Sequence, residues 1–341
     1  MIFNLTSSNK KIIYNDTLDH YKNGLLRILN IDENSFKEWV EISSLSKKDN
    51  LLNKLSEGFL KLKNFNKKNN IENNNIIGPN NEQGNVWFSS IFENPSYGIA
   101  SSDDIAWLIK DNQREITTPS YEEEYFEGDI NSGGYSDYLA QEGWRIEKSR
   151  KQVKELIKIT GLNFGTVLDI GSGYGYFRKA LEENNFDHYG IEVSKHANFI
   201  SKNKYNFDAF EGALSDYLNH NPIKFDAIML GDVIEHIPDP IVFLKQINSI
   251  LKIGGFVILK TPNIDCPEVK IFGPCYHSFK REHLIYFSPS SLKRYAEFSG
   301  FEVFFAKSNS HLLTGFVGEK QTNEWSESLK GSDLIFYLRK K

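Results

Sequence analysis

The stretch Thr166-Val-Leu-Asp-Ile-Gly-Ser-Gly-Tyr-Gly-Tyr-Phe177 decides the fold of this 341-residue chain. Its apolar start, Val167 to Ile170, predicts a short buried strand, and the glycines after it predict a turn that leads into a helix from about Phe177. Glycine lets a backbone turn tightly and approach a ligand, and the N-terminus of the following helix favours polar ligand groups. Asp169 lies near the carboxyl end of the strand, where open α/β sheets bind their ligands.

A second acidic residue, Glu192, lies near the end of the next apolar run, Tyr189-Gly-Ile-Glu-Val193. A carboxylate at this distance along the chain suits paired hydrogen bonds to the two hydroxyls of a ribose. A dinucleotide-binding turn would place glycine at position 176, where this chain has Tyr. The pattern Asp-x-Gly-x-Gly-x-Gly instead resembles motif I of the class I S-adenosylmethionine-dependent methyltransferases.

Composition limits the class of protein further. A net charge of −5 argues against a dedicated nucleic-acid binder, since such proteins are usually basic. Cys266 and Cys275 are the two cysteines, so neither a disulfide framework nor a cysteine-rich zinc site is expected. The chain shows neither a signal-peptide pattern nor an apolar run of about eighteen residues, so we expect a soluble, cytoplasmic protein that does not enter a membrane.

The sequence before residue 120 divides into three expected segments. Apolar residues at three-to-four spacing predict a helical region of unknown role over 1–63, which could pack on the main domain or form a homodimer. Residues 64–85 contain ten asparagines and lose this periodicity, so we expect a linker there. In the connecting segment 86–119, Ser102-Asp-Asp followed by an apolar cluster predicts a helix. That cluster consists of Ile105, Trp107, Leu108 and Ile109.

Helix and strand patterns alternate through the rest of the chain. Further helices are expected over 145–160, 195–204, 241–251 and 289–299, and further strands over 207–211, 225–230, 256–260, 301–306 and 333–338. The glycines at 254 and 255 predict a turn before the fifth strand. This order predicts the α/β class, with a seven-stranded, doubly wound, Rossmann-like sheet that ends in an antiparallel pair and a helical N-terminal region.

Four landmarks occur in the order found in class I methyltransferases, namely 167–175, Glu192, 231–240 and 252–263. The resemblance covers about 120–341, the expected catalytic domain, and implies that the cofactor is S-adenosylmethionine. It places the methionine part of the cofactor at the glycine turn, the ribose at Glu192, and the remainder at the turns after the next two strands. The implied cofactor-binding residues are Asp169, Gly171, Ser172, Gly173, Tyr174, Gly175, Glu192, Val193, Gly212, Ala213, Gly231, Asp232 and Val233.

Segment 120–144 is unusually rich in tyrosine beside acidic residues. One interpretation is a surface helix packed with aromatic rings. The other is a lid, in which Tyr125, Tyr135 or Tyr138 closes over cofactor and substrate. A similar tyrosine-rich entry precedes the catalytic domain of many small-molecule and sugar methyltransferases, and we count Tyr135 and Tyr138 among the expected cofactor contacts.

The sequence Asp232-Val-Ile-Glu235-His236 follows the expected fourth strand, and His283 lies in a later loop. We expect these residues to lead into a helix, on which Asp232 shares a face with Glu235 and His236 at i, i+3 and i, i+4. In one hypothesis His236 or His283, supported by Glu235, is a general base or positions the acceptor, because imidazole titrates near neutral pH. In a second, less favoured hypothesis, Glu235, His236 and His283, with or without Asp232, hold a divalent metal ion. This set of residues resembles that of small-RNA 3′-terminal 2′-O-methyltransferases. A purely structural role is the third.

Segment 264–288 is a long aromatic insertion, which we expect to cover the acceptor pocket. Its motifs Phe272-Gly-Pro…His277 and Glu282-His-Leu-x-Tyr-Phe-Ser-Pro-x-Ser-Leu292 resemble those of methyltransferases of surface-carbohydrate and secondary-metabolite pathways. Lys280 and Arg281 could bind an anionic group of the acceptor. The expected acceptor is therefore a hydroxyl of a sugar or other small metabolite, for example a nucleotide-linked sugar. The alternatives are metal-assisted 2′-O-methylation of RNA and a non-catalytic partner subunit that binds the cofactor.

Overall fold

The computed structural model describes residues 76–341 except 89–96, 112, 118–120, 122–124, 127–137, 221–222, 273–275, 277, 310–322 and 325. The expected helices over 1–63 and the first part of the expected linker lie outside these residues. The chain forms two units. The first comprises Met1–Ile116, Pro262–Pro289 and Ser308–Asp333, and the second comprises Thr117–Thr261, Ser290–Lys307 and Leu334–Lys341.

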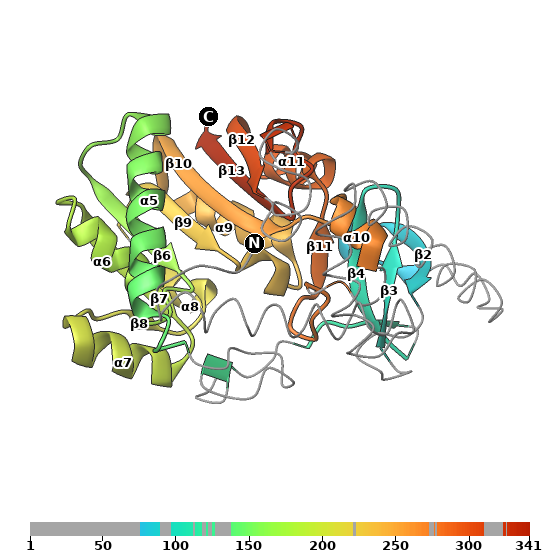
Figure 1. The fold of residues 1–341 in the computed structure, drawn as a ribbon, viewed down its shortest axis with the longest axis horizontal. Coiled ribbons are helices and arrows are strands. Elements are labelled where there is room, and N and C mark those ends of the chain that lie inside the picture. The colour runs from blue at the N-terminus through green and yellow to red at the C-terminus, as the bar shows by residue number, and fades with distance from the viewer. Residues whose placement is uncertain are drawn as a thin grey trace, which may run out of the picture. The chain divides into compact units, whose positions relative to one another are not determined.

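A seven-stranded sheet in the order β12-β13-β10-β9-β6-β7-β8 is the centre of the second unit (Figure 1). Its strands are β6 Thr166–Ile170, β7 Asp187–Glu192, β8 Phe210–Glu211, β9 Phe225–Gly231, β10 Leu251–Pro262, β12 Phe301–Asn309 and β13 Asp333–Lys340. The five strands from β10 to β8 run parallel to their neighbours. This arrangement confirms the expected α/β fold and sheet, and it brings the carboxyl ends of those five strands to one edge.

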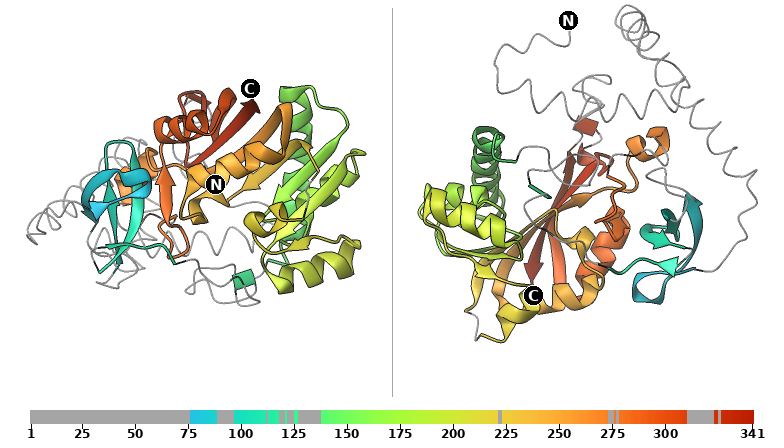
Figure 2. Two further views of the ribbon diagram at one scale, coloured as in Figure 1. Left: turned by 180° about the vertical axis from the view of Figure 1, so that it is seen from behind. Right: turned by 90° about the horizontal axis from the view of Figure 1, so that it is seen from below.

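Helices cover both faces of this sheet, with α5 on one face and α9 on the other (Figure 1 and Figure 2). They are α5 Glu142–Thr160, α6 Tyr176–Glu182, α7 Lys195–Tyr205, α8 Leu214–Leu218, α9 Pro240–Ile250 and α11 Pro289–Phe298, with a short 3-10 turn η3 at Ile234–His236. The limits follow from local chemistry. The side chain of Asp239 accepts a hydrogen bond from the Val242 amide to start α9, and Gly161 ends α5 in the left-handed conformation.

The core on the α5 face consists of apolar side chains from α5, α6 and the central strands. Its buried members are Val153, Leu156, Val167, Phe177, Ala180, Leu181, Phe186, Ala227, Met229, Ile258, Ile335 and Tyr337. Because both faces of the parallel part of the sheet are covered, the central strands β6, β9 and β10 contain long buried apolar runs. Buried polar residues near the strand ends are therefore exceptions in this sheet and indicate a functional role. None of the described helices is long and apolar enough to cross a membrane.

The first unit contains a smaller antiparallel sheet in the order β1-β2-β3-β4-β11, with β5 paired to β4. Its strands are β1 Ile76–Ile77, β2 Gln83–Phe88, β3 Tyr97–Ser101, β4 Ile105–Lys110, β5 Gln113–Arg114 and β11 Ile285–Phe287. A 3-10 turn η1 at Pro79–Asn81 joins β1 to β2, and α10 spans Pro267–Phe272. The insertion 264–288 thus supplies α10 and a strand of this sheet.

Three sequence predictions are wrong in detail. The expected helix around 102–109 is strand β4, whose first five residues are all buried. A continuous apolar run of this length does not distinguish a buried strand from a helix by periodicity. The end of the expected linker forms β1, η1 and the start of β2. Gly254 and Gly255 lie within the bounds of β10, at an irregularity in its register between Leu251 and Phe256, so the strand begins before these glycines rather than after them.

Candidate active site

The glycine turn between β6 and α6 has a backbone that other residues would not adopt easily. Gly171, Gly173 and Gly175 have φ angles of +72°, +50° and +84°. A Cβ atom on Gly171 would lie 2.8 Å from Cγ2 of Val233, and one on Gly175 would lie 2.7 Å from Oγ of Ser201. The turn therefore needs glycine both for its conformation and for its close approach to neighbouring chain.

Glu192, at the end of β7, is buried and is bound to the glycine turn. Its Oε2 accepts a hydrogen bond from the Gly173 amide at 2.7 Å, and its Oε1 accepts one from the Ser194 amide at 2.9 Å. Burial raises the pKa of this carboxyl above its ordinary value, although the backbone hydrogen bonds act in the opposite direction. Each oxygen keeps a second lone pair that can accept a hydroxyl hydrogen.

Asp169, near the end of β6, is the second buried acid of this edge. Burial raises the pKa of its carboxyl to about 7, while the nearby Arg178 lowers it and Glu192 raises it. Asp169 and Gly190 are register partners in the parallel pair β6–β7, so the two acids lie near the ends of adjacent strands. The structure thus brings Asp169 and Glu192 together with the glycine turn.

Aromatic side chains pack beside this turn. The ring of Tyr138 meets that of Tyr174 edge to face, with centroids 4.9 Å apart, and its hydroxyl would lie 3.4 Å from a Cβ on Gly173. The guanidinium of Arg145 lies over the ring of Tyr138, with Cζ 3.8 Å from the ring centroid. Tyr125 packs against the same cluster. Tyr135 lies outside the described residues, and the lid function stays a prediction.

The turns after β7 and β8 are adjacent through the short pairing of these strands. The amide of Gly212 donates to the carbonyl of Glu192 at 3.1 Å, and φ of Gly212 is +147°. Ala213 precedes α8, and its amide donates to the side chain of Asp216 at 3.1 Å. Val193 is exposed at the same edge. Residues 193, 212 and 213 therefore lie at the same edge of the sheet. Their contact with the cofactor stays a prediction.

The residues after β9 do not form the helical face that the sequence suggested. Asp232 has φ +58°, in the left-handed region, and only Ile234–His236 form a 3-10 turn. Asp232 is instead held by Lys260 of β10, whose Nζ lies 2.6 Å from Oδ1 and whose carbonyl accepts the Asp232 amide at 3.0 Å. The expected i, i+4 geometry is therefore wrong, because a left-handed residue interrupts the helix at its first position.

Glu235 is 1% exposed and forms one side-chain hydrogen bond among the described residues, from Oγ1 of Thr261 to Oε2 at 2.9 Å. Its Oε1 is buried without a partner in that part of the chain. Burial, with a contribution from the charge of Asp232, raises the pKa of Glu235 to about 8. His236 is also buried, and its ring meets that of Tyr121 edge to face at 5.8 Å. A buried carboxyl with a raised pKa and a buried imidazole therefore follow β9.

His283 belongs to the first unit, whereas Glu235 and His236 belong to the second. Its Nδ1 lies 2.8 Å from the carbonyl oxygen of Ser278, and its ring is tilted against that of Tyr286. In the same loop, Lys280 lies 3.6 Å from the carboxylate of Glu282, and Arg281 stacks over Tyr97. A base or metal site shared by Glu235, His236 and His283 therefore stays a prediction.

Three functional candidates were not predicted from the sequence. Lys260 and Thr261 continue β10 at the active-site edge, where Lys260 is the register partner of Gly231 in β9. Lys260 and Thr261 could have been identified in the sequence as two polar residues that directly follow the apolar run of the fifth strand. Arg178 of α6 is buried beneath β7, and a basic residue within the apolar face of a helix was the available signal.

Comparison with known proteins agrees with this geometry. Residues 141–304 match the family model described as a methyltransferase domain. The ubiquinone biosynthesis O-methyltransferase of Aliivibrio fischeri (strain MJ11) is 21% identical over 139 residues, which cover 37% of this chain and 59% of the relative. That of Haemophilus ducreyi is 29% identical over 119 residues, which cover 31% of this chain and 49% of the relative. This chain therefore spans between about half and three fifths of the length of these two relatives.

Among solved structures, a SAM-dependent methyltransferase from Archaeoglobus fulgidus is 20% identical, with a TM-score of 0.45, and the match covers 60% of this chain and 99% of that one. Residues 141–304 therefore form a methyltransferase domain, in agreement with the resemblance seen in the motifs. Its cofactor is S-adenosylmethionine.

Proposed function

We propose that this chain transfers a methyl group from S-adenosylmethionine to a hydroxyl of a sugar or other small metabolite. The observation that carries the proposal is a row of buried polar residues at one edge of an otherwise apolar sheet. Four adjacent parallel strands, β7, β6, β9 and β10, contribute them at or just after their carboxyl ends. The residues are Glu192, Asp169, Glu235 and Thr261.

The residues at this edge fit S-adenosylmethionine. The glycine turn leaves no room for a Cβ at Gly171 or Gly175, and Oγ of Ser172 is buried without a partner among the described residues. Glu192 keeps lone pairs for the ribose hydroxyls while its other lone pairs hold the turn. Asp169 would lie beside the methionine part. When bound, the cofactor supplies a methyl group activated by its sulfonium.

On the acceptor side, we assign His236 the removal or holding of the hydroxyl proton. Imidazole has a pKa near neutral pH, so it can accept a proton without a large cost. The raised pKa of Glu235 favours its protonated form near neutral pH, so Oε1, which has no partner among the described residues, can donate a hydrogen bond. Thr261 fixes the orientation of this carboxyl through Oε2. The chain thereby orients an oxygen acceptor, and orientation is the main requirement of an in-line displacement.

The acceptor class is supported by two observations. The relatives named above are O-methyltransferases of ubiquinone biosynthesis, and the net charge of −5 does not favour a polyanionic acceptor such as RNA. The aromatic insertion 264–288, with buried Tyr276, Phe279 and Tyr286, is compatible with a small organic acceptor. A cytoplasmic location and a homodimer through residues 1–63 are further parts of this proposal.

Two measurements test the proposal. Calorimetry with S-adenosylhomocysteine, after chelation and again with magnesium, should show micromolar binding that does not depend on the metal. Transfer of labelled methyl to a panel of sugar nucleotides and phenolic metabolites should then fall sharply in kcat in His236→Asn, with cofactor affinity retained. His220→Asn, a change at an exposed histidine of the same unit, is the matched control.

The outcomes separate the alternatives. Cofactor binding without transfer to any acceptor would favour a non-catalytic partner subunit. Transfer that requires magnesium or manganese and acts on RNA would favour the metal-assisted alternative. If neither S-adenosylmethionine nor S-adenosylhomocysteine binds, the assignment of the cofactor site is wrong.

A further inference from the structure

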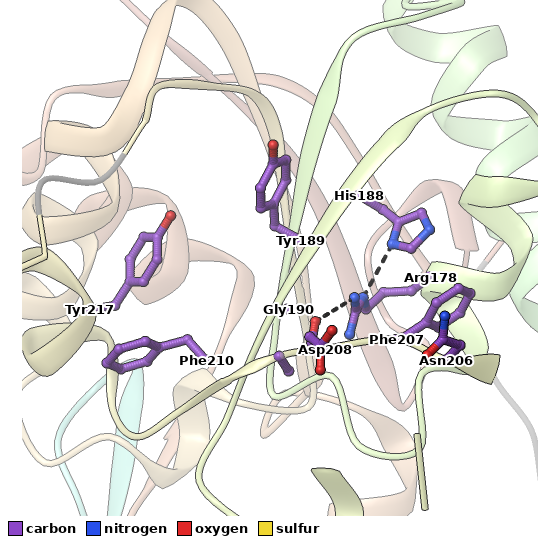
Figure 3. A pocket seen from close by; sticks show the side chains of 10 residues that line it. Arg178, His188, Tyr189, Gly190, Asn206, Phe207, Asp208, Phe210 and Tyr217 are labelled. Carbon is purple, nitrogen blue, oxygen red and sulfur yellow. Dashed lines mark hydrogen bonds between the residues drawn. The ribbon is translucent and has the colours of Figure 1, made fainter. Parts of the chain in front are cut away.

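An open pocket of about 480 Å³ lies at the β7–β8 side of the large sheet (Figure 3). These strands pair only through Ile191 with Phe210 and Glu192 with Glu211. Upstream of that pairing they separate, and the pocket is lined by residues of β7 and by the chain 206–209 that enters β8. None of its lining residues belongs to the expected cofactor site, so the pocket is a separate feature of the second unit.

The charged group of this pocket is the guanidinium of Arg178, which is 2% exposed. Its Nε lies 3.3 Å from Nδ1 of His188, and its Nη2 donates to the carbonyl of Asp208 at 2.7 Å, as the dashed lines in Figure 3 show. Its Nη1 is buried and has no hydrogen-bond partner in the described part of the chain. A buried guanidinium N–H without an acceptor is unfavourable, so this atom indicates a missing acceptor.

Gly190 gives this guanidinium its position. A Cβ atom at residue 190 would lie 2.8 Å from Nη1 of Arg178 and 3.0 Å from Oγ of Ser172. Both of these donors are buried without partners among the described residues. The absence of a side chain at this one position of β7 therefore leaves room beside Nη1, which is itself buried.

Aromatic rings form the opposite wall of the pocket. Tyr189, Phe210 and Tyr217 line it, and Figure 3 shows their rings on the side away from His188. The rings of Phe210 and Tyr217 meet edge to face at 5.4 Å, and Tyr189 is 42% exposed. This wall suits the flat or apolar body of a ligand.

The charge of the pocket suits a single negative group. Arg178 and His188 are its basic residues, and burial together with the charge of Arg178 lowers the pKa of His188, so the imidazole is neutral near pH 7. The carboxylate of Asp208 is largely exposed and paired with Lys202 at 2.7 Å. The carboxyl of Asp169 interacts electrostatically with Arg178, and the burial of Asp169 favours its neutral form. One available donor edge suits a carboxylate oxygen, whereas a phosphate usually recruits several donors.

We propose that this pocket binds a small aromatic monocarboxylate. One carboxylate oxygen accepts a hydrogen bond from Nη1 of Arg178, and the ring packs against Tyr189 and Tyr217. The residues that line the pocket are not those assigned to the methyl donor, although Arg178 interacts with Asp169 of the cofactor site, so the ligand is an effector or a second recognition element rather than the methyl donor.

Benzoate is the probe, and benzamide is its uncharged counterpart of the same shape. Calorimetry is carried out on the full chain with the cofactor site saturated by S-adenosylhomocysteine. Benzoate is expected to bind in the millimolar range or tighter, and benzamide at least about tenfold more weakly. Absence of benzoate binding under these conditions, equal binding of benzamide, or stronger binding of inorganic phosphate would overturn the proposal.

Variants locate the binding. Arg178→Met is expected to weaken benzoate binding roughly tenfold or more, and Arg150→Met, which removes an exposed arginine of α5, leaves it unchanged. Because a change at a buried arginine can prevent folding, Ala209→Phe and Tyr217→Ala test the same pocket from its lining. Thermal melting and S-adenosylhomocysteine binding confirm that each variant is folded. Benzoate binding that persists at full strength in both Ala209→Phe and Tyr217→Ala would contradict the proposal.

Discussion

The carboxylate of Glu192 holds the amide of Gly173 at 2.7 Å, so the end of β7 fixes the turn that follows β6. Gly171 and Ser172 add to this connection, since both amides donate to the carbonyl of Ile191 at 2.9 and 3.2 Å. Glu192, which is expected to bind the ribose, therefore also stabilises the glycine turn that would contact the methionine part of the cofactor. Changes at Glu192 should affect both.

Glu192→Gln is expected to weaken S-adenosylhomocysteine binding by roughly tenfold to a hundredfold, which corresponds to about 1–3 kcal/mol for a lost hydrogen bond to a charged group. The amide keeps the size of the side chain but has one acceptor oxygen where the carboxylate has two. Calorimetry measures the change. Glu211→Gln, at the register partner in β8, removes an exposed acid instead and should leave the affinity unchanged. Equal effects of both changes would contradict the assignment.

The pH dependence of stability should report on Asp169. Burial raises its pKa from 3.8 to about 7 in the folded protein. Between these values the folded state binds a proton that the unfolded chain has released, so the free energy of unfolding falls as pH rises from about 4 to about 7. Asp169→Asn removes this contribution and should flatten the curve of unfolding free energy against pH. From about pH 5 to about pH 8, the difference in unfolding free energy between the variant and the wild type should shift in favour of the variant by roughly 1–3 kcal/mol.

Urea titrations at several pH values measure this effect. Asp208→Asn, at a side chain that is largely exposed, serves as the control and should leave the slope close to that of the wild type. If the curves of Asp169→Asn and the wild type run parallel from pH 4 to 8, Asp169 is not the group whose protonation is coupled to folding.

The large sheet could be predicted because its strands alternate with helices and end in recognisable turns. β6, β7 and β9 are apolar runs bounded by Gly, Asp or Glu, and α9 begins at an Asp-Pro pair. Strand β4 could not be predicted, because its five buried residues fit either a strand or a helix by apolar content alone. Its partner β11 lies far along the chain, and a single sequence carries no signal for that pairing.

The site could be predicted only as far as local sequence determines it. Asp169 and Glu192 lie near or at strand ends that the apolar runs define. The bond between Thr261 and Glu235 and the pair of Lys260 with Asp232 arise from the register of β10 against β9, which the sequence does not specify. The left-handed conformation of Asp232 similarly depends on this tertiary contact, because asparagine and aspartate tolerate that region without requiring it.

The small sheet can be tested through Gly84 of β2. A Cβ atom at this position would lie 2.3 Å from Cη2 of Trp107 and 2.6 Å from the carbonyl oxygen of Ser101. Gly84→Ala should therefore destabilise the first unit by roughly 1–3 kcal/mol, as overpacking of a filled core does. Gly143→Ala, where a Cβ would meet nothing within 4 Å in helix α5, should instead stabilise the chain by about 0.5–1 kcal/mol.

Trp107 fluorescence during urea unfolding would follow the first unit, provided that the other tryptophans are replaced by phenylalanine. A Gly84→Ala variant as stable as the wild type would mean that β2 does not pack on Trp107 in solution. If residues 102–109 were helical, Gly84 and Trp107 would have no such contact, so the same experiment tests the assignment of β4.

Thr261 should stabilise the buried carboxyl of Glu235. Thr261→Val keeps the shape of the side chain but removes the donor to Oε2, and Oε1 already has no partner among the described residues. Leaving both oxygens of a buried group without a donor costs about 1–3 kcal/mol, whereas Thr261→Ser keeps the hydroxyl and should lose much less. In a double-variant cycle, Glu235→Leu should make the further change Thr261→Val nearly neutral, because no polar group is then left unpaired. Additive losses in that cycle would show that Thr261 acts on stability without Glu235.

Under the proposed function, Thr261→Val should also lower kcat more than it changes KM for S-adenosylmethionine, because Thr261 orients the acceptor-side carboxyl and not the cofactor.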